Sequence, residues 1–112
     1  MNIESLREYC LSKPRTEEAM PFGPDTLVYK VNGKMYLVIA LDEDQLSFNV
    51  KCDPDKAIEL REEFACVLPG YHMNKNHWNT IVVDGSVSNK KLKEWIDHSY
   101  SLVSSGLQKK NT

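Results

Sequence analysis

The segment LPGYHMNKNHWNT, residues 68–80, gathers side chains that could bind or react with a ligand. It contains two histidines, one lysine, three asparagines, one tyrosine and one tryptophan, but no acidic residue. Imidazole can bind metals and transfer protons, and lysine can neutralise a phosphate. Amide and aromatic side chains can contact nucleic-acid bases. Three kinds of site therefore have to be weighed for this segment: a metal centre, a catalytic centre and a nucleic-acid interface.

The two histidines of the segment are a weak signal for a metal or for catalysis. His72 and His77 are five residues apart, which matches no helical face, and the next acidic residue along the chain is Asp84. A transition metal would need a further ligand from a distant part of the chain. Cys66 is near His72 in sequence, but no signature of a cysteine enzyme surrounds it. We expect no enzyme, no metal site and no cofactor.

Nucleic-acid binding needs cations for phosphate groups and flat or amide side chains for bases. Lys75 supplies one cation, with Asn74 and Asn76 beside it as candidate base or sugar contacts. One lysine does not make a footprint, so other cations would have to lie alongside it. The candidates are Lys30 and Lys34 from a predicted hairpin, or Lys90, Lys91 and Lys93 from a predicted helix. The alternative is that Trp78 fills the core and the other side chains satisfy loop backbone groups.

The composition bounds the class of protein. A chain of 112 residues suits one core, so we expect a single domain over residues 1–112. Cys10, Cys52 and Cys66 are odd in number and widely spaced, which argues against a disulfide framework. The start of the chain lacks a basic leader before an apolar run, and no window reaches the length of a membrane span. We expect a cytoplasmic protein with no membrane partner.

Helical segments are predicted at three places. In residues 2–14 the apolar side chains are spaced one or two helical turns apart, which predicts a short amphipathic helix with Asn2 as its cap and Pro14 as its end. A second helix is expected to start at Pro54, in the first helical position, with Asp53 as its cap. A long helix begins near Ser88 and buries one apolar face, and residues 107–112 are expected to fray.

The clearest strand signal is TLVYKVNGKMYLVIAL, residues 26–41. Its centre is Asn32-Gly33, a pair suited to a two-residue type I′ turn. A tight turn would place Val31 opposite Lys34, Tyr29 opposite Tyr36 and Leu27 opposite Val38. Both faces of this hairpin are largely apolar, so we expect it to be central in the sheet and covered on most of both sides.

Two further strands complete the expected sheet. LSFNVK, residues 46–51, alternates as a half-buried strand, and another strand is expected from about Asn79 to Val83. Hairpins joined in this order give an antiparallel sheet, and amphipathic helices need a face to cover. The predicted fold is therefore α+β in two layers, with the helices packed on one face of an antiparallel sheet.

The chain resembles the MmcQ/YjbR family. The resemblance rests on MPFGPDTLVYKVNGKMYLVI, DPDKAIELRE, PGYHMNKNHWNTIVVDG and IDHSYSLV, which occur in this order over nearly the whole chain. It implies a CyaY-like fold and DNA binding through a double-wing arrangement of β-hairpins. The family signature falls on Gly33, Lys34, Gly70, Tyr71, His72, Met73, Asn74, Lys75, His77, Trp78 and Asn79. Family members often carry a second basic residue where this chain has Asn76.

The leading hypothesis is a non-enzymatic DNA-binding domain with His72, Lys75 and His77 near phosphate and Lys30 and Lys34 as a supporting wing. The alternative is a module that meets a protein partner through its sheet face or its acidic helix. Because the resembled fold is also frataxin-like, a metal-binding variant is a further alternative. Its ligands would come from the acidic residues of the middle region, Asp42, Glu43, Asp44, Asp55, Glu59, Glu62 and Glu63.

Overall fold

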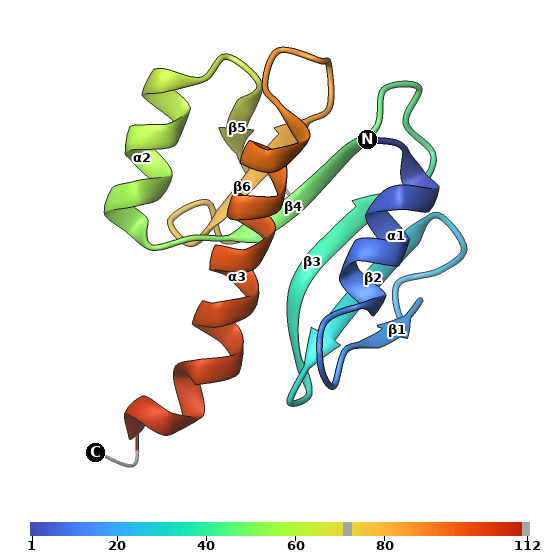
Figure 1. The fold of residues 1–112 in the computed structure, drawn as a ribbon, viewed down its shortest axis with the longest axis vertical. Helices are drawn as coiled ribbons and strands as arrows, with labels where there is room; N and C mark the ends of the chain where they lie inside the picture. Colours follow the sequence, from blue (N-terminus) through green and yellow to red (C-terminus); the bar gives the residue numbers. More distant parts are fainter. Residues whose placement is uncertain (71–72, 111–112) are drawn as a thin grey trace.

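The computed structural model describes residues 1–70 and 73–110, with side chains up to residue 105. The elements in chain order are α1 (Ile3–Leu11), β1 (Glu17–Ala19), β2 (Thr26–Val31), β3 (Lys34–Ala40), β4 (Ser47–Lys51), α2 (Pro54–Glu63), β5 (Val67–Pro69), β6 (Trp78–Val82) and α3 (Asn89–Lys110). The strands form one antiparallel sheet in the order β1-β2-β3-β4-β6-β5, and the helices lie on one side of it (Figure 1). The predicted two-layer α+β fold is confirmed.

The helix starts follow largely from local sequence. At α1 the side chain of Asn2 accepts the Ser5 backbone N–H at 2.9 Å, and Ser5 Oγ accepts the Asn2 N–H at 3.0 Å. This reciprocal capping box fixes the first turn. At α3, Ser88 Oγ accepts the Lys91 N–H at 3.1 Å, so the predicted start near Ser88 is confirmed. The side chain of Asp53 makes no capping bond at α2, although Pro54 occupies the first helical position as predicted.

The last helix, α3, runs to Lys110. The fraying expected from residue 107 onwards stays a prediction. No proline interrupts this segment, and basic residues near a helix C-terminus favour its dipole.

The register of the β2–β3 hairpin is partly as predicted. Asn32 and Gly33 both have positive φ, 54° and 77°, as a type I′ turn requires, and Val31 pairs with Lys34. Beyond that pair the predicted register is wrong, because the pairing shifts by one residue between Tyr29 and Lys30. Tyr29 therefore pairs with Leu37 rather than with Tyr36, and Leu27 pairs with Ile39 rather than with Val38.

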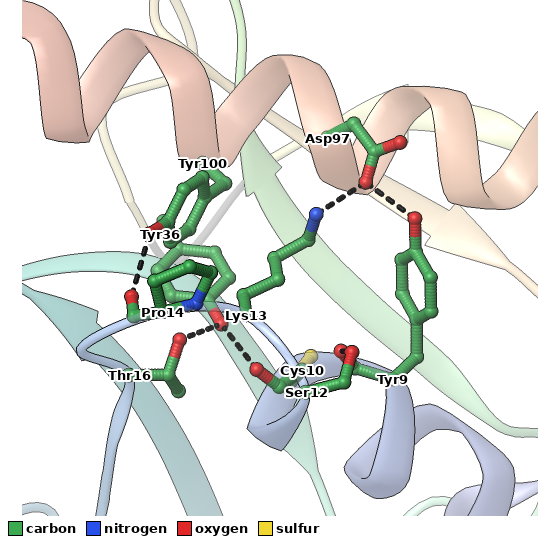
Figure 2. A network of polar contacts seen from close by, with 9 residues as sticks. All are labelled: Tyr9, Cys10, Ser12, Lys13, Pro14, Thr16, Tyr36, Asp97 and Tyr100. Carbon is green, nitrogen blue, oxygen red and sulfur yellow. Dashed lines mark hydrogen bonds and ion pairs between the residues drawn. The ribbon is translucent and has the colours of Figure 1, made fainter.

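The register shift lets two neighbouring side chains reach the core. Tyr36 and Leu37 both belong to the core on the helix side, whereas regular alternation along a strand would put one of them on the opposite face. Tyr36 donates its hydroxyl to the backbone oxygen of Cys10 at 3.2 Å and lies 2.9 Å from Thr16 Oγ1 (Figure 2). The bulge thus attaches the sheet to the end of α1.

The two faces of the sheet have different surroundings. On the helix side, side chains from β2, β3, β4 and β6 pack with α1 and α3 in a core that includes Leu6, Phe48, Ile81 and Ile96. No helix of the described chain covers the opposite face, which we call the helix-free face. Its central side chains Val28 and Val38 are still buried, and the hairpin lies inside the sheet as predicted.

A polar cluster fastens α1 to α3 (Figure 2). Lys13 Nζ and Tyr9 Oη both donate to one carboxylate oxygen of Asp97. The ammonium group also lies over two aromatic rings, 4.9 Å from the centre of Tyr9 and 5.0 Å from that of Tyr100. Burial, followed by the Asp97 carboxylate, raises the pKa of Tyr9 to about 12, so its hydroxyl stays a donor at neutral pH. Asp97 thus offsets the charge of a largely buried lysine.

Replacing Asp97 should therefore destabilise the fold. The side chain of Lys13 is only 14% exposed, so Asp97→Asn leaves a buried cation with a weaker partner. We expect a loss of about 1–2 kcal/mol in the free energy of unfolding, measured by chemical denaturation. Glu94→Gln is the matched control, because it removes the exposed pair with Lys91 and should cost about 0.5 kcal/mol or less. Equal effects of the two variants would contradict a structural role for the cluster.

Candidate nucleic-acid interface

Two strand connections leave the sheet at the same end (Figure 1). The first is the Asn32-Gly33 turn between β2 and β3. The second is the connection between β5 and β6, residues 70–77. Lys51 at the end of β4 lies opposite Trp78 at the start of β6, and Val50 pairs with Leu37 of β3. Because every neighbouring pair is antiparallel, this register brings the second connection to the end of the sheet that carries the turn.

This end of the sheet carries four lysines. Lys30 and Lys34 belong to the β2–β3 hairpin, Lys75 belongs to the second connection, and Lys51 ends β4 between them. Lys34 and Lys75 are exposed, and Lys30 and Lys51 are partly exposed. Within residues 1–70 and 73–105, none of the four forms an ion pair. We call Lys30, Lys34, Lys51 and Lys75 the lysine group.

Lys51 was not among the residues singled out from sequence. The alternation of residues 46–51 put it on the polar side of a strand, together with Ser47 and Asn49. Its importance comes from the pairing of β4 with β6, which sets it beside the second connection. A pattern within one strand cannot reveal which strand will be its neighbour.

The lysines at the start of α3 do not join this group. Asn89 at the start of that helix accepts a hydrogen bond from the amino group of Met1 at 3.1 Å. Lys91 pairs with Glu94 at 3.4 Å, and the Nζ of Lys93 lies 5.1 Å from the ring centre of Tyr9. Lys90, Lys91 and Lys93 therefore belong to the helical layer, near α1. The second source of cations considered from sequence is not beside Lys75.

Residues 73–77 form a compact turn that exposes Lys75. The Asn74 side-chain oxygen accepts the Asn76 N–H at 3.0 Å, and the Asn74 backbone oxygen accepts the His77 N–H at 3.0 Å. Asn74, Lys75, Asn76 and His77 are all exposed, which leaves them accessible to a ligand. The predicted site residues Tyr71 and His72 lie outside the described residues.

Gly70 is required by a close approach of two backbones. Its N–H donates to the Trp78 carbonyl at 2.9 Å. A Cβ placed on Gly70 would lie 2.9 Å from both the Cβ and the carbonyl oxygen of Trp78, which is closer than real Cβ atoms come. Trp78 is buried as predicted, but it lies on the helix-free face rather than in the core between sheet and helices. Gly70 and Trp78 therefore set the position of the second connection.

Asn79 has a structural position. It is 1% exposed, and its amide nitrogen donates to the Ala57 backbone oxygen at 3.3 Å, which joins β6 to α2. Because it is buried and bonded to α2, the Asn79 side chain is not available to contact a base. Its side-chain oxygen lacks a hydrogen-bond partner among the described atoms and lines a cavity of about 10 Å³ together with His98.

A groove of about 580 Å³ lies on the helix-free face next to the lysine group. One end is formed by Met73, Asn74 and Trp78, from the second connection and the start of β6. The floor comes from Met35, Val38 and Ala40 of β3 and from Asn49 of β4. Acidic side chains of the β3–β4 loop mark the other end. The full lining is Phe22, Thr26, Met35, Val38, Ala40, Asp42, Glu43, Asn49, Met73, Asn74 and Trp78.

The cysteines do not resemble activated nucleophiles. All three are free and buried. Burial raises the pKa of Cys10 to about 12 and that of Cys52 to about 11, so neither thiol ionises appreciably at neutral pH. Within the described residues, no group of three or more His, Cys, Asp or Glu side chains is arranged to hold a metal ion. The acidic residues proposed for a frataxin-like variant therefore do not gather into such a site.

The amino-acid sequence matches a known protein family. The YjbR family model matches residues 11–102. The chain belongs to the YjbR family. The uncharacterized protein YbdF of Escherichia coli O157:H7 is 32% identical to it over 108 residues, covering 96% of this chain and 88% of YbdF. The uncharacterized protein YjbR of Escherichia coli K12 is 30% identical over 100 residues, covering 89% of this chain and 85% of the relative.

Solved structures of YjbR-like chains agree with the fold. DR2400 of Deinococcus radiodurans, described as a DUF419 domain, is similar with a TM-score of 0.87 and 37% identity, covering 92% of this chain and 78% of the other. A protein from Pseudomonas syringae is similar with a TM-score of 0.80 and 26% identity, covering 92% and 99%. The resemblance to the MmcQ/YjbR family is thus confirmed. No helix of the described residues is long and apolar enough to cross a membrane.

The contact between Gly70 and Trp78 predicts a steric cost in this YjbR-family chain. Gly70→Ala should lower the free energy of unfolding by about 1–3 kcal/mol, because neighbouring backbone must move to admit a methyl group. Ala65→Ser is a control that alters an exposed position just before β5. Chemical denaturation measures both variants. An unchanged midpoint for Gly70→Ala would show that the two backbones are not held together.

His98 predicts a dependence of stability on pH. Burial, and next the nearby charge of Lys56, lower the pKa of His98, although Asp53 at 3.9 Å opposes the shift. The unfolded chain then takes up a proton below about pH 6.5 that the folded chain resists. We expect the free energy of unfolding to fall as the pH drops below that value, and His98→Gln to reduce the fall. His77→Gln is the exposed control, and an equal effect of both variants would contradict the prediction.

Proposed function

We propose that this YjbR-family chain is a non-enzymatic DNA-binding domain, and that DNA contacts the end of the sheet that carries the lysine group. One observation supports this most strongly. Two hairpin connections leave the sheet at the same end, and both carry lysines that form no ion pair within the described chain, although Glu17 of β1 lies opposite Lys30. Such a pair of projections matches the double-wing arrangement that the family resemblance implies.

The electrostatics favour modest affinity. The chain has a net charge of -2, so attraction for a phosphate backbone must come from the local arrangement of cations. Four lysines can neutralise up to about four phosphates, which predicts a slope of roughly -3 to -4 in log K against log salt.

A salt titration with lysine variants tests the proposal. Lys51→Ala and Lys75→Ala should each weaken the binding of a DNA duplex and flatten the salt slope by about one. Lys90→Ala is the matched control, because Lys90 is exposed at the start of α3, in the helical layer. Fluorescence anisotropy measures all three. Failure to bind at low salt, or equal effects of all three substitutions, would overturn the proposal.

A protein partner is the second candidate, and the surface of α2 favours it. Ile58 is 50% exposed on that helix, with Asp55 one turn before it and Glu62 one turn after it. An exposed apolar side chain among acids suits a partner with a basic and apolar surface. Ile58→Ser would weaken such an association without altering the salt dependence of DNA binding, which separates the two candidates.

A further inference from the structure

The groove on the helix-free face begins where the lysine group ends. Lys51 and Asn49 lie on the same face of β4, two residues apart, and Asn49 lines the groove. Two residues of a strand span roughly 6–7 Å. Trp78, opposite Lys51, also lines the groove. A phosphate at Lys51 would therefore be separated from the groove by a distance comparable to the sugar of one nucleotide.

The groove offers surfaces on which a flat ring can stack. Trp78 and Met73 form the end near the lysines, and Phe22 belongs to the lining with its side chain 65% exposed. Because its ring is so exposed, Phe22 contributes little to the stability of the fold through burial. Aromatic faces and the methionine thioether both pack well against a nucleic-acid base.

The polar side chains that line the groove include both hydrogen-bond donors and hydrogen-bond acceptors. Asn49 Oδ1 accepts the Thr80 hydroxyl, and Asn74 Oδ1 accepts the Asn76 N–H, so each amide oxygen already has a partner. The amide N–H groups of Asn49 and Asn74 make no hydrogen bond to a described residue and can donate to a ligand. The carboxylates of Asp42 and Glu43 can only accept.

The distribution of charge orients a nucleotide along the groove. Asp42 and Glu43 repel a phosphate from one end, whereas Lys51 and Lys75 attract it beyond the other. A base that points into the groove would present its polar edge to the carboxylates. Adenine, cytosine and guanine carry an exocyclic amine that can donate to them, whereas thymine flanks its single N–H with two carbonyl oxygens.

We propose that the groove receives one unstacked base of the bound nucleic acid and favours bases that carry an exocyclic amine. This inference rests on the proposed DNA-binding function. The phosphate of that nucleotide stays with the lysine group, its ring stacks between the aromatic and thioether side chains, and its amine meets the acidic end.

Duplexes that differ in one nucleotide test the inference. One duplex is fully paired, and the others carry a single extra nucleotide that is adenosine, thymidine or an abasic residue. We expect the extra adenosine to tighten binding about tenfold over the paired duplex. The extra thymidine should give a smaller gain, and the abasic residue should give none, because it lacks a ring to stack.

Substitutions in the groove provide the second arm. Phe22→Ala should remove most of the preference for the extra adenosine. The affinity for the paired duplex, and the slope of that affinity against salt, should stay unchanged. Asp42→Asn should reduce the difference in affinity between the duplex with the extra adenosine and the duplex with the extra thymidine. Leu11→Ala is the matched control, because Leu11 is 47% exposed at the end of α1, in the helical layer. Circular dichroism confirms that each variant is folded.

The outcomes separate the two proposals. Equal binding of all four duplexes, or a Phe22→Ala variant that behaves like Leu11→Ala, would overturn the base pocket and leave DNA binding intact. If Phe22→Ala weakens the binding of every duplex equally, the base pocket is also overturned. The same holds if a protein partner occupies the groove and the affinity for DNA does not depend on the extra base. If no duplex binds at low salt, the proposed function itself fails and the base pocket fails with it.

Discussion

The antiparallel pairing of β4 with β6 determines where the candidate binding residues lie. In this register Lys51 lies opposite Trp78, so the end of β4 adjoins the connection that carries Lys75. The pairing of β3 with β4 then brings the β2–β3 turn to the same end. A shift of one residue between β4 and β6 would turn Trp78 towards the helices and Asn79 towards solvent. The close contact of Gly70 with Trp78 helps to hold the register in place.

The helix-free face separates opposite charges within one small surface. Lys30 and Lys51 lie on this face towards the end with the two connections, and Asp42 and Glu43 lie at the far end of the groove. A chain with a net charge of -2 can therefore still present a local attraction for phosphate. The acids also restrict how an anionic polymer can lie, because only one end of the groove is favourable for its backbone. Local charge separation of this kind contributes more to orientation than to affinity.

Turns and helix caps, which depend on neighbouring residues, were predictable from the sequence. Features that depend on contacts between distant segments were not. The Asn32-Gly33 turn follows from the tolerance of both residues for positive φ, and the cap at Asn2 follows from its side chain. The bulge beside Tyr36 was missed because it depends on a contact with the end of α1. Lys51 was overlooked for a similar reason, since its neighbours become known only when β4 pairs with β6.

Amide chemical-shift mapping with a short DNA duplex at low salt is the most direct experiment. If DNA contacts the end of the sheet that carries the lysine group, the perturbed amides will be those of residues 30–34, 51 and 73–78. The amides of α2 and of the first turns of α3 will stay unchanged, because they belong to the helical layer. Perturbations centred on α2, or none at all at a protein-saturating concentration of duplex, would contradict the proposed interface.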